Sequence, residues 1–292
     1  MGNILHIILL LVITVCGVCS FNPGNSYEVY NQYGEVIKIW GSGVYAYDSF
    51  FKAPIFIGSD FTVLVFVIPL MIITIIRRKK LCSTEYNIRM FSLMCCMLYY
   101  SASICFGVTY NCLHLVYIAL FGLSFYRTVC LLLKLHTADV TNKEICTFQL
   151  TKGMSAFLVI SGISLFVAWL PDIITSLIQG KPLDLIEVYT TEITYVLDMG
   201  VISPLMFITL YLTKKKKFIS YVLLRMIFLI CMIVGIMLPV QSAFQIAAGI
   251  SIPIPALITK VLIFVLLAIF SFILNHRLKK ETKYVEELYE NN

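Results

Sequence analysis

The sequence predicts an all-α fold, a polytopic bundle of eight transmembrane helices with a small extracytoplasmic β-hairpin. The composition is the first observation that predicts a membrane protein, because 60% of the residues are hydrophobic and 13% are charged, with a mean hydropathy of +0.91. Soluble domains carry about 25% charged residues. Charged clusters also divide the chain into apolar runs of about 20 residues, the length that crosses a bilayer core. Finally, the polar stretches between the runs are shorter than the roughly 40 residues that a domain needs to fold alone.

The first apolar run, residues 4–20, has no Lys or Arg before it. Because a cleaved signal peptide usually begins with positive charge, a retained first helix or signal anchor over residues 1–20 is favoured. If this helix is instead a cleaved signal, seven spans remain. Cys16 and Cys19 have the spacing of a redox pair, but no thioredoxin-like pattern accompanies them.

Residues 21–54 are expected to form an extracytoplasmic loop. Within it, Tyr27–Tyr30 and Glu35–Trp40 are rich in aromatic and β-branched residues and flank a short turn sequence. This pattern predicts a small hairpin.

The rest of the chain predicts a seven-helix bundle over residues 55–274 and a cytoplasmic tail over 275–292. Pro171 is expected to end the fifth span, with a separate surface helix over Asp172–Gln179. The predicted spans are Ile55–Ile76, Met90–Val108, Leu113–Leu133, Met154–Leu170, Tyr189–Leu212, Phe218–Val240 and Pro255–Leu274.

The positive charges favour one orientation. The basic runs 77–80 and 214–217 each follow a predicted span directly. Because cytoplasmic loops carry an excess of Lys and Arg, the C-terminus is predicted to be cytoplasmic, as is the N-terminus of a retained first helix. Of the 22 Lys and Arg residues, the exceptions on the outer side are Lys38, Lys52, Lys181 and Lys260.

Polar side chains gather at the predicted outer ends of several spans. If the helices converge there, these side chains form an outward-opening polar pocket that could hold a small molecule or ion. The candidates are Asp48, Asp60, Tyr110, Asn111, His114, Thr191, Thr194, Asp198, Gln241, Gln245 and Lys260.

Asp198 and Lys260 are the most informative of these, because both are predicted to lie a turn or more inside a span. A charge at that depth costs roughly 2.5–3.5 kcal/mol on insertion scales, so both are expected to face the bundle interior and could pair with each other. The spacing of Thr191, Thr194 and Asp198 predicts that the three share one helix face.

Two Gly-x-x-x-Pro elements, Gly200–Pro204 and Gly235–Pro239, are expected to kink their spans, and each could free a glycine carbonyl to coordinate a ligand. Arg127 and Arg225 lie in inner halves of spans and are expected to extend toward lipid head groups.

No motif identifies a catalytic centre. Asp48 and Asp60 are too close in the sequence to lie on two adjacent spans, as an intramembrane aspartyl protease requires. The four histidines, His6, His114, His136 and His276, are scattered over both sides, which predicts no metal site. No phosphate loop or dinucleotide fingerprint is present, so no cofactor and no nucleic-acid partner are expected.

Several blocks together resemble a group of uncharacterised multi-pass bacterial membrane proteins. The most specific is Thr190-Thr-Glu-Ile-Thr194 followed by Leu197-Asp-Met-Gly200, and the others are Gly43–Ser49, Gly58–Asp60, Phe106–Asn111 and Pro204-Leu205. The resemblance implies a bacterial cytoplasmic membrane location and supplies no catalytic residues.

The sequence therefore favours a membrane protein that handles a small molecule or ion through an outer pocket around Asp60, His114, Asp198 and Lys260, with proton-linked transport as one form. An intramembrane enzyme acting on lipid or envelope precursors, and a partner-binding membrane subunit, remain alternatives. The lipid bilayer is the one partner that the composition itself indicates.

Overall fold

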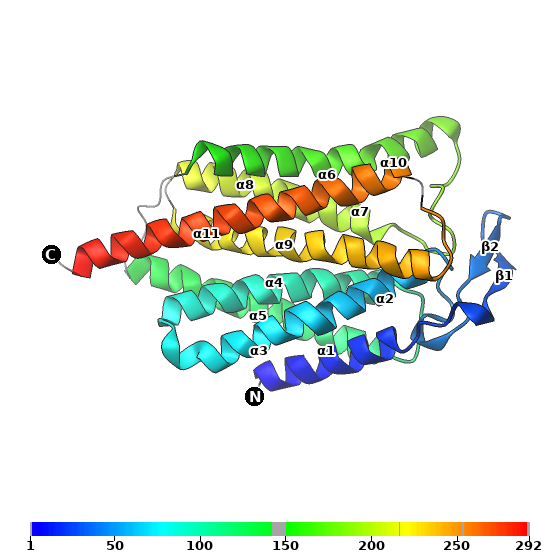
Figure 1. The fold of residues 1–292 in the computed structure, drawn as a ribbon, viewed down its shortest axis with the longest axis horizontal. Helices are drawn as coiled ribbons and strands as arrows, with labels where there is room; N and C mark the ends of the chain where they lie inside the picture. The colour runs from blue at the N-terminus through cyan, green and yellow to red at the C-terminus, as the bar shows by residue number, and fades with distance from the viewer. Residues whose placement is uncertain (1, 142–149, 216, 253, 291–292) are drawn as a thin grey trace.

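The computed structural model describes residues 2–141, 150–215, 217–252 and 254–290, and most of them are helical. The helices lie side by side as an elongated bundle, with the β-hairpin at one end and the C-terminal helix extending past the other (Figure 1). The ends of α3 and α8, which lead into the basic runs, lie opposite the hairpin.

The α-helices and strands follow the chain in this order: α1 Gly2–Val18, β1 Tyr27–Tyr30, β2 Val36–Ile39, α2 Ala53–Thr62, α3 Ile68–Ile76, α4 Ser83–Gly107, α5 His114–Thr141, α6 Lys152–Gln179, α7 Ile193–Leu197, α8 Ser203–Lys214, α9 Phe218–Ala247, α10 Ile254–Leu257 and α11 Ile263–Glu290. Three π-helical segments connect neighbouring helices: η3 Val63–Val67, η5 Asp198–Ile202 and η6 Ile258–Leu262.

Six helices in the described ranges are long and apolar enough to cross a membrane, which supports a multi-pass membrane protein. They are Ala53–Lys80, Ser83–Gly107, His114–Thr137, Lys152–Gln179, Ile193–Lys214 and Phe218–Ala247. The helix α1 is apolar but shorter, and it packs into the bundle through the buried Leu10 and Ile13.

The hairpin forms where the sequence predicts it. Strand β1 pairs antiparallel with β2, with Tyr27 opposite Ile39 and Tyr30 opposite Val36. The turn is held by the Asn31 side chain, whose oxygen accepts hydrogen bonds from the N–H groups of Tyr33 and Glu35.

The expected break at Pro171 is wrong, because α6 runs through this proline without interruption to Gln179. Proline is tolerated inside membrane helices, where local adjustment can satisfy the freed carbonyl. The helix ends instead at Gly180, which has a left-handed φ of 62° and donates its N–H to Leu177 O. This glycine C-cap is the stronger stop signal.

The two Gly-x-x-x-Pro elements behave differently. Before Pro204 the chain opens into the π-turn η5, in which the Ser203 N–H bonds to Asp198 O. A similar π-turn, η3, precedes Pro69. In contrast, α9 continues through Pro239, and Gly235 lets it approach α11 closely.

The core lies around α4 and α9, which occupy the middle of the bundle (Figure 1). Met94 and Met97 of α4 and Val222, Leu224 and Phe228 of α9 are almost completely buried. A second apolar cluster, around Trp40, Tyr45, Phe56 and Tyr189, joins the hairpin and the loop before α7 to the hairpin end of α2.

Candidate functional site

Asp60 is a completely buried carboxyl group in the last turn of α2. Its Oδ2 accepts a hydrogen bond of 2.6 Å from the Tyr45 hydroxyl, and its Oδ1 accepts one of 2.5 Å from the Tyr100 hydroxyl. Among the described residues no cation forms an ion pair with it. Two neutral donors therefore hold a carboxyl group in a place where its ionised form costs several kcal/mol.

The space for this carboxyl group comes from Gly17 at the end of α1. A Cβ atom on Gly17 would lie 1.6 Å from Asp60 Oδ2 and 2.6 Å from Cγ. The helix α1 therefore approaches α2 closely only because this position has no side chain, and Asp60 fills the gap.

Asp198 is another buried carboxyl group that forms no ion pair in the described chain. It opens the π-turn η5 and is 8% exposed. Its Oδ1 accepts a 2.8 Å hydrogen bond from the Tyr99 hydroxyl, and its Oδ2 accepts a 2.9 Å bond from Trp169 Nε1. Trp169 in turn stacks on Tyr195, with ring centroids 4.8 Å apart.

Tyr99 and Tyr100 are neighbours on α4, so their side chains leave the helix in different directions. Each donates to a buried carboxylate, Tyr99 to Asp198 and Tyr100 to Asp60. The central helix thus separates two tyrosine–aspartate pairs, and no hydrogen bond between described residues joins one to the other.

Asp48 lies in the loop before α2 and is also completely buried. Its Oδ1 accepts hydrogen bonds from the Thr109 N–H, at 2.9 Å, and the Tyr189 hydroxyl, at 3.0 Å. Its Oδ2 is buried with no hydrogen-bond partner in the described chain. Burial raises the pKa of Asp48 to about 7, although the Thr109 and Tyr189 hydrogen bonds and the Lys52 charge oppose the change.

A set of loop contacts encloses Asp48 from the outside. Lys52 forms an ion pair with Glu192 and lies 4.3 Å from the centre of the Tyr189 ring. Ser49 donates a hydrogen bond to the Glu187 carboxylate, and burial raises the pKa of Glu187. These contacts tie the loop before α2 to the loop before α7.

Asn111 lies in the turn between α4 and α5, two residues after Thr109. It is buried, and its side-chain amide donates to the Tyr117 hydroxyl at 3.4 Å. Asn111 is thus tied to Thr109, which donates to Asp48, and to Tyr117, and no hydrogen bond between described residues joins it to Asp60.

Gln241 and Gln245 hold α9 against α2 and the loop that precedes it. Gln241 donates to the Ser59 hydroxyl at 2.7 Å, next to Asp60, and Gln245 donates to Phe51 O at 3.1 Å. Gln241 thus links α9 to α2, Gln245 links α9 to the loop before α2, and neither donates to a carboxylate in the described contacts.

Among the remaining candidates, those with described side chains form no hydrogen bond with these carboxyl groups in the described contacts. Tyr110 is exposed and packs its ring against His114. The expectation that Thr191, Thr194 and Asp198 share a helix face is wrong for Thr191, because α7 begins only at Ile193 and Thr191 is exposed. The backbone of Lys260 belongs to η6, whereas its side chain lies outside the described part of the structure, so the predicted pair with Asp198 is not described.

The aromatic donors are what sequence reasoning missed. Tyr45, Tyr99, Tyr100, Trp169 and Tyr189 donate to Asp48, Asp60 and Asp198. In the sequence they look like ordinary apolar or interfacial residues. The tandem Tyr99-Tyr100 at mid-span, away from an aromatic belt, was the available signal.

Comparison with protein-family models, curated proteins and solved structures found no match to this chain. In the described residues no group of three His, Cys, Asp or Glu side chains is arranged to hold a metal ion. The chemistry available to Asp48, Asp60 and Asp198 is the uptake and release of protons at carboxyl groups that accept hydrogen bonds from aromatic side chains.

Proposed function

We propose that this protein is an eight-span protein of the cell membrane that handles a small molecule or ion by proton-linked transport. The eight spans include α1 and the apolar stretch from residue 255 to 274. The C-terminus lies in the cytoplasm, in keeping with the basic ends of α3 and α8.

The observation that carries this proposal is the environment of Asp60. A fully buried carboxyl group on two tyrosine hydroxyls, with no ion-pair partner in the described chain, is costly to keep for structure alone. Ionisable groups inside membrane helices commonly serve proton or ion pathways. The proton would reach Asp60 from the hairpin end, where the loop that carries Asp48 lies.

Asp198 would take part on the other side of α4. It begins a π-turn, and such wide turns recur at functional sites. A change in protonation there would alter the hydrogen bonds to Tyr99 and Trp169, which hold α4 and α6 near this turn.

The test is proton movement into proteoliposomes loaded with a pH-sensitive dye, with alkali cations and small amines supplied in turn as substrate. We expect substrate-dependent proton flux that Asp60→Asn abolishes, because the amide oxygen can accept from one tyrosine hydroxyl and the NH2 can donate to the other, but the amide carries no exchangeable charge. Glu28→Gln is the control, since Glu28 is an exposed acid of the hairpin. Equal flux in the wild type and in Asp60→Asn would refute the proposal.

One observation favours a second candidate, a partner-binding membrane subunit. The hairpin presents exposed aromatic side chains, with Tyr30 at 79% and Tyr33 at 50% exposure. Aromatic residues are enriched at protein interfaces. Co-purification of a fixed stoichiometric partner that is lost in a Tyr30→Ser, Tyr33→Ser variant would favour this candidate.

A further inference from the structure

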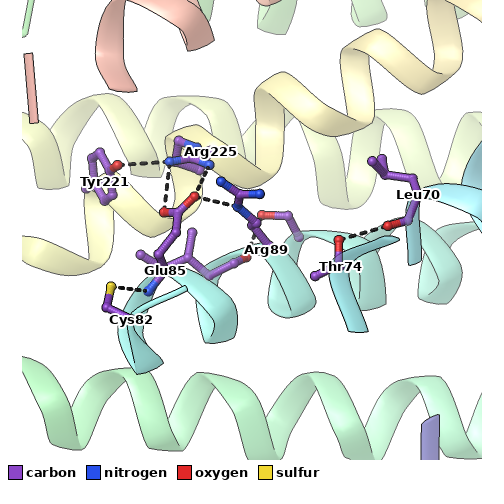
Figure 2. A network of polar contacts seen from close by, with 9 residues as sticks. Leu70, Thr74, Cys82, Glu85, Arg89, Tyr221 and Arg225 are labelled. Carbon is purple, nitrogen blue, oxygen red and sulfur yellow. Dashed lines mark hydrogen bonds and ion pairs between the residues drawn. The ribbon is translucent and has the colours of Figure 1, made fainter. Parts of the chain in front are cut away.

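At the end of the bundle opposite the hairpin, one carboxylate is shared by two arginines (Figure 2). Glu85 lies in the first turn of α4. Arg89 donates from Nε to Glu85 Oε1 at 2.6 Å, and Arg225 of α9 donates from both Nη atoms to the two carboxylate oxygens at 3.2 and 3.3 Å. The Tyr221 hydroxyl accepts a further hydrogen bond of 2.9 Å from Arg225.

The burial of Arg225 corrects the expectation that it extends to lipid head groups. It is 5% exposed and is held by Glu85 and Tyr221 (Figure 2). A buried arginine is held well by the two oxygens of a carboxylate because its donors form a planar fork. Arg225 is therefore a fixed part of the cluster, and Arg89 is the arginine nearer to solvent, with 30% of its side chain exposed.

Lys279 is a third cation whose charge interacts with those of Arg225, Arg89 and Glu85. Lys279 of α11 lies beyond the apolar stretch that ends at residue 274, and burial together with the charges of Arg225 and Arg89 lowers its pKa to about 8. Glu85 opposes this change but does not cancel it. Among the described side chains of this cluster, the Glu85 carboxylate is outnumbered by three cations, Arg89, Arg225 and Lys279, so the described charges have a positive excess.

Some hydrogen-bond donors of the cluster are unused in the described contacts. In the contacts that the structure describes, Arg89 uses only Nε, which leaves its two Nη groups, and Lys279 forms no ion pair. In Figure 2 the dashed contact from Arg89 to Glu85 starts at Nε, and no dashed line reaches the two outer nitrogens of Arg89 among the residues drawn. The exposed basic run Arg77–Lys80 follows α3 at the same end of the bundle.

We propose that this cluster is a binding site for a phosphate group, with Arg89 and Lys279 as the direct ligands and Arg225 as the fixed charge behind them. A phosphate group carries one to two negative charges and several acceptor oxygens, which suit a guanidinium fork and an ammonium group together. At this end of the bundle the phosphate comes either from an anionic lipid head group or from a soluble phosphate compound.

The experiment measures binding to the full-length protein in detergent, with short-chain phosphatidylglycerol as the lipid probe and inorganic phosphate as the soluble probe. Short-chain phosphatidylcholine, which has no net charge, serves as the control lipid. The melting temperature is measured at increasing concentrations of each probe. The dissociation constant is obtained from the midpoint of the curve of melting temperature against probe concentration.

We expect Arg89→Gln and Lys279→Gln each to weaken binding at least about tenfold, the lower end of what losing one charge-assisted hydrogen bond costs. Arg89→Lys should lie between the wild type and Arg89→Gln, because it keeps the charge but not the fork. Lys79→Gln is the matched control, as Lys79 is an exposed cation of the same basic end.

Stabilisation by phosphatidylglycerol alone identifies the ligand as a lipid head group, and stabilisation by inorganic phosphate identifies a soluble ligand. The proposal is overturned if neither probe binds. It is equally overturned if the folded, monodisperse Arg89→Gln, Lys279→Gln double variant binds either probe as tightly as Lys79→Gln does.

Discussion

Asp60 keeps its place because Gly17 has no side chain. A methyl group there would overlap the carboxylate and displace it from the hydroxyls of Tyr45 and Tyr100. At the scale of single residues, the site thus depends on a contact between a glycine and a charged group from different helices.

We therefore expect Gly17→Ala to destabilise the protein by about 1–3 kcal/mol, the usual cost of overpacking a core. The measurement is the melting temperature in detergent. Gly122→Ala is the matched control, because a Cβ at this helical position contacts nothing, so it should be neutral or stabilise by up to about 1 kcal/mol. Equal melting temperatures for the two variants would contradict the packing argument.

Asp48 should make stability depend on pH. Its pKa is raised to about 7 in the folded protein, above its ordinary value near 4, so the folded state binds the proton more tightly. Stability is then complete below about pH 4 and falls as the pH rises through 7.

Asp48→Asn removes this titration, so we expect a flatter profile of melting temperature between pH 5 and 8 than in the wild type. Some slope should remain, because burial also raises the pKa of Glu187. A variant whose profile parallels that of the wild type would show that Asp48 does not titrate in this range.

At the scale of helices, close approach is set by small residues facing one another. Gly235 of α9 faces α11, where a Cβ would lie 2.2 Å from the Ala268 methyl group and 2.9 Å from Phe264 O. In membranes such contacts bring backbones together, since apolar surface alone gives helices little reason to associate.

Gly235→Ala should therefore lower the melting temperature by forcing α9 and α11 apart. Ala268→Gly in the same chain removes the opposing methyl group and should recover most of the loss. The measurement is a double-mutant cycle. Strictly additive losses would show that the two positions do not face each other.

At the scale of the whole molecule, the two ends of the bundle differ in chemistry. The hairpin end holds buried carboxyl groups behind aromatic donors, and the opposite end carries Arg77–Lys80 and the Glu85 cluster. This division suits an orientation with the basic end in the cytoplasm.

Two natural cysteines allow that orientation to be measured. Cys112, in the turn between α4 and α5, and Cys82, just before α4, are both exposed and lie at opposite ends of α4. In single-cysteine variants we expect a membrane-impermeant maleimide to label Cys112 in intact cells and Cys82 only after permeabilisation. The reverse pattern would place the basic end outside.

The sequence by itself determined that this is a helical, multi-pass membrane bundle with a hairpin, because hydropathy and turn chemistry are local and are written in consecutive residues. It also marked Asp60 and Asp198, since a carboxylate inside an apolar run is costly wherever the helix packs. It failed at Pro171, where a glycine nine residues later decides the helix end.

Only the tertiary structure decided which groups hold those carboxylates. Tyr45 and Tyr100 meet Asp60 from two other segments, and Tyr99 and Trp169 meet Asp198 from α4 and α6. An aromatic residue in a span packs equally well against lipid, a neighbouring helix or a polar group, so its own sequence context does not reveal its partner. The rotation and packing of whole helices fix that choice, and they depend on small residues such as Gly17.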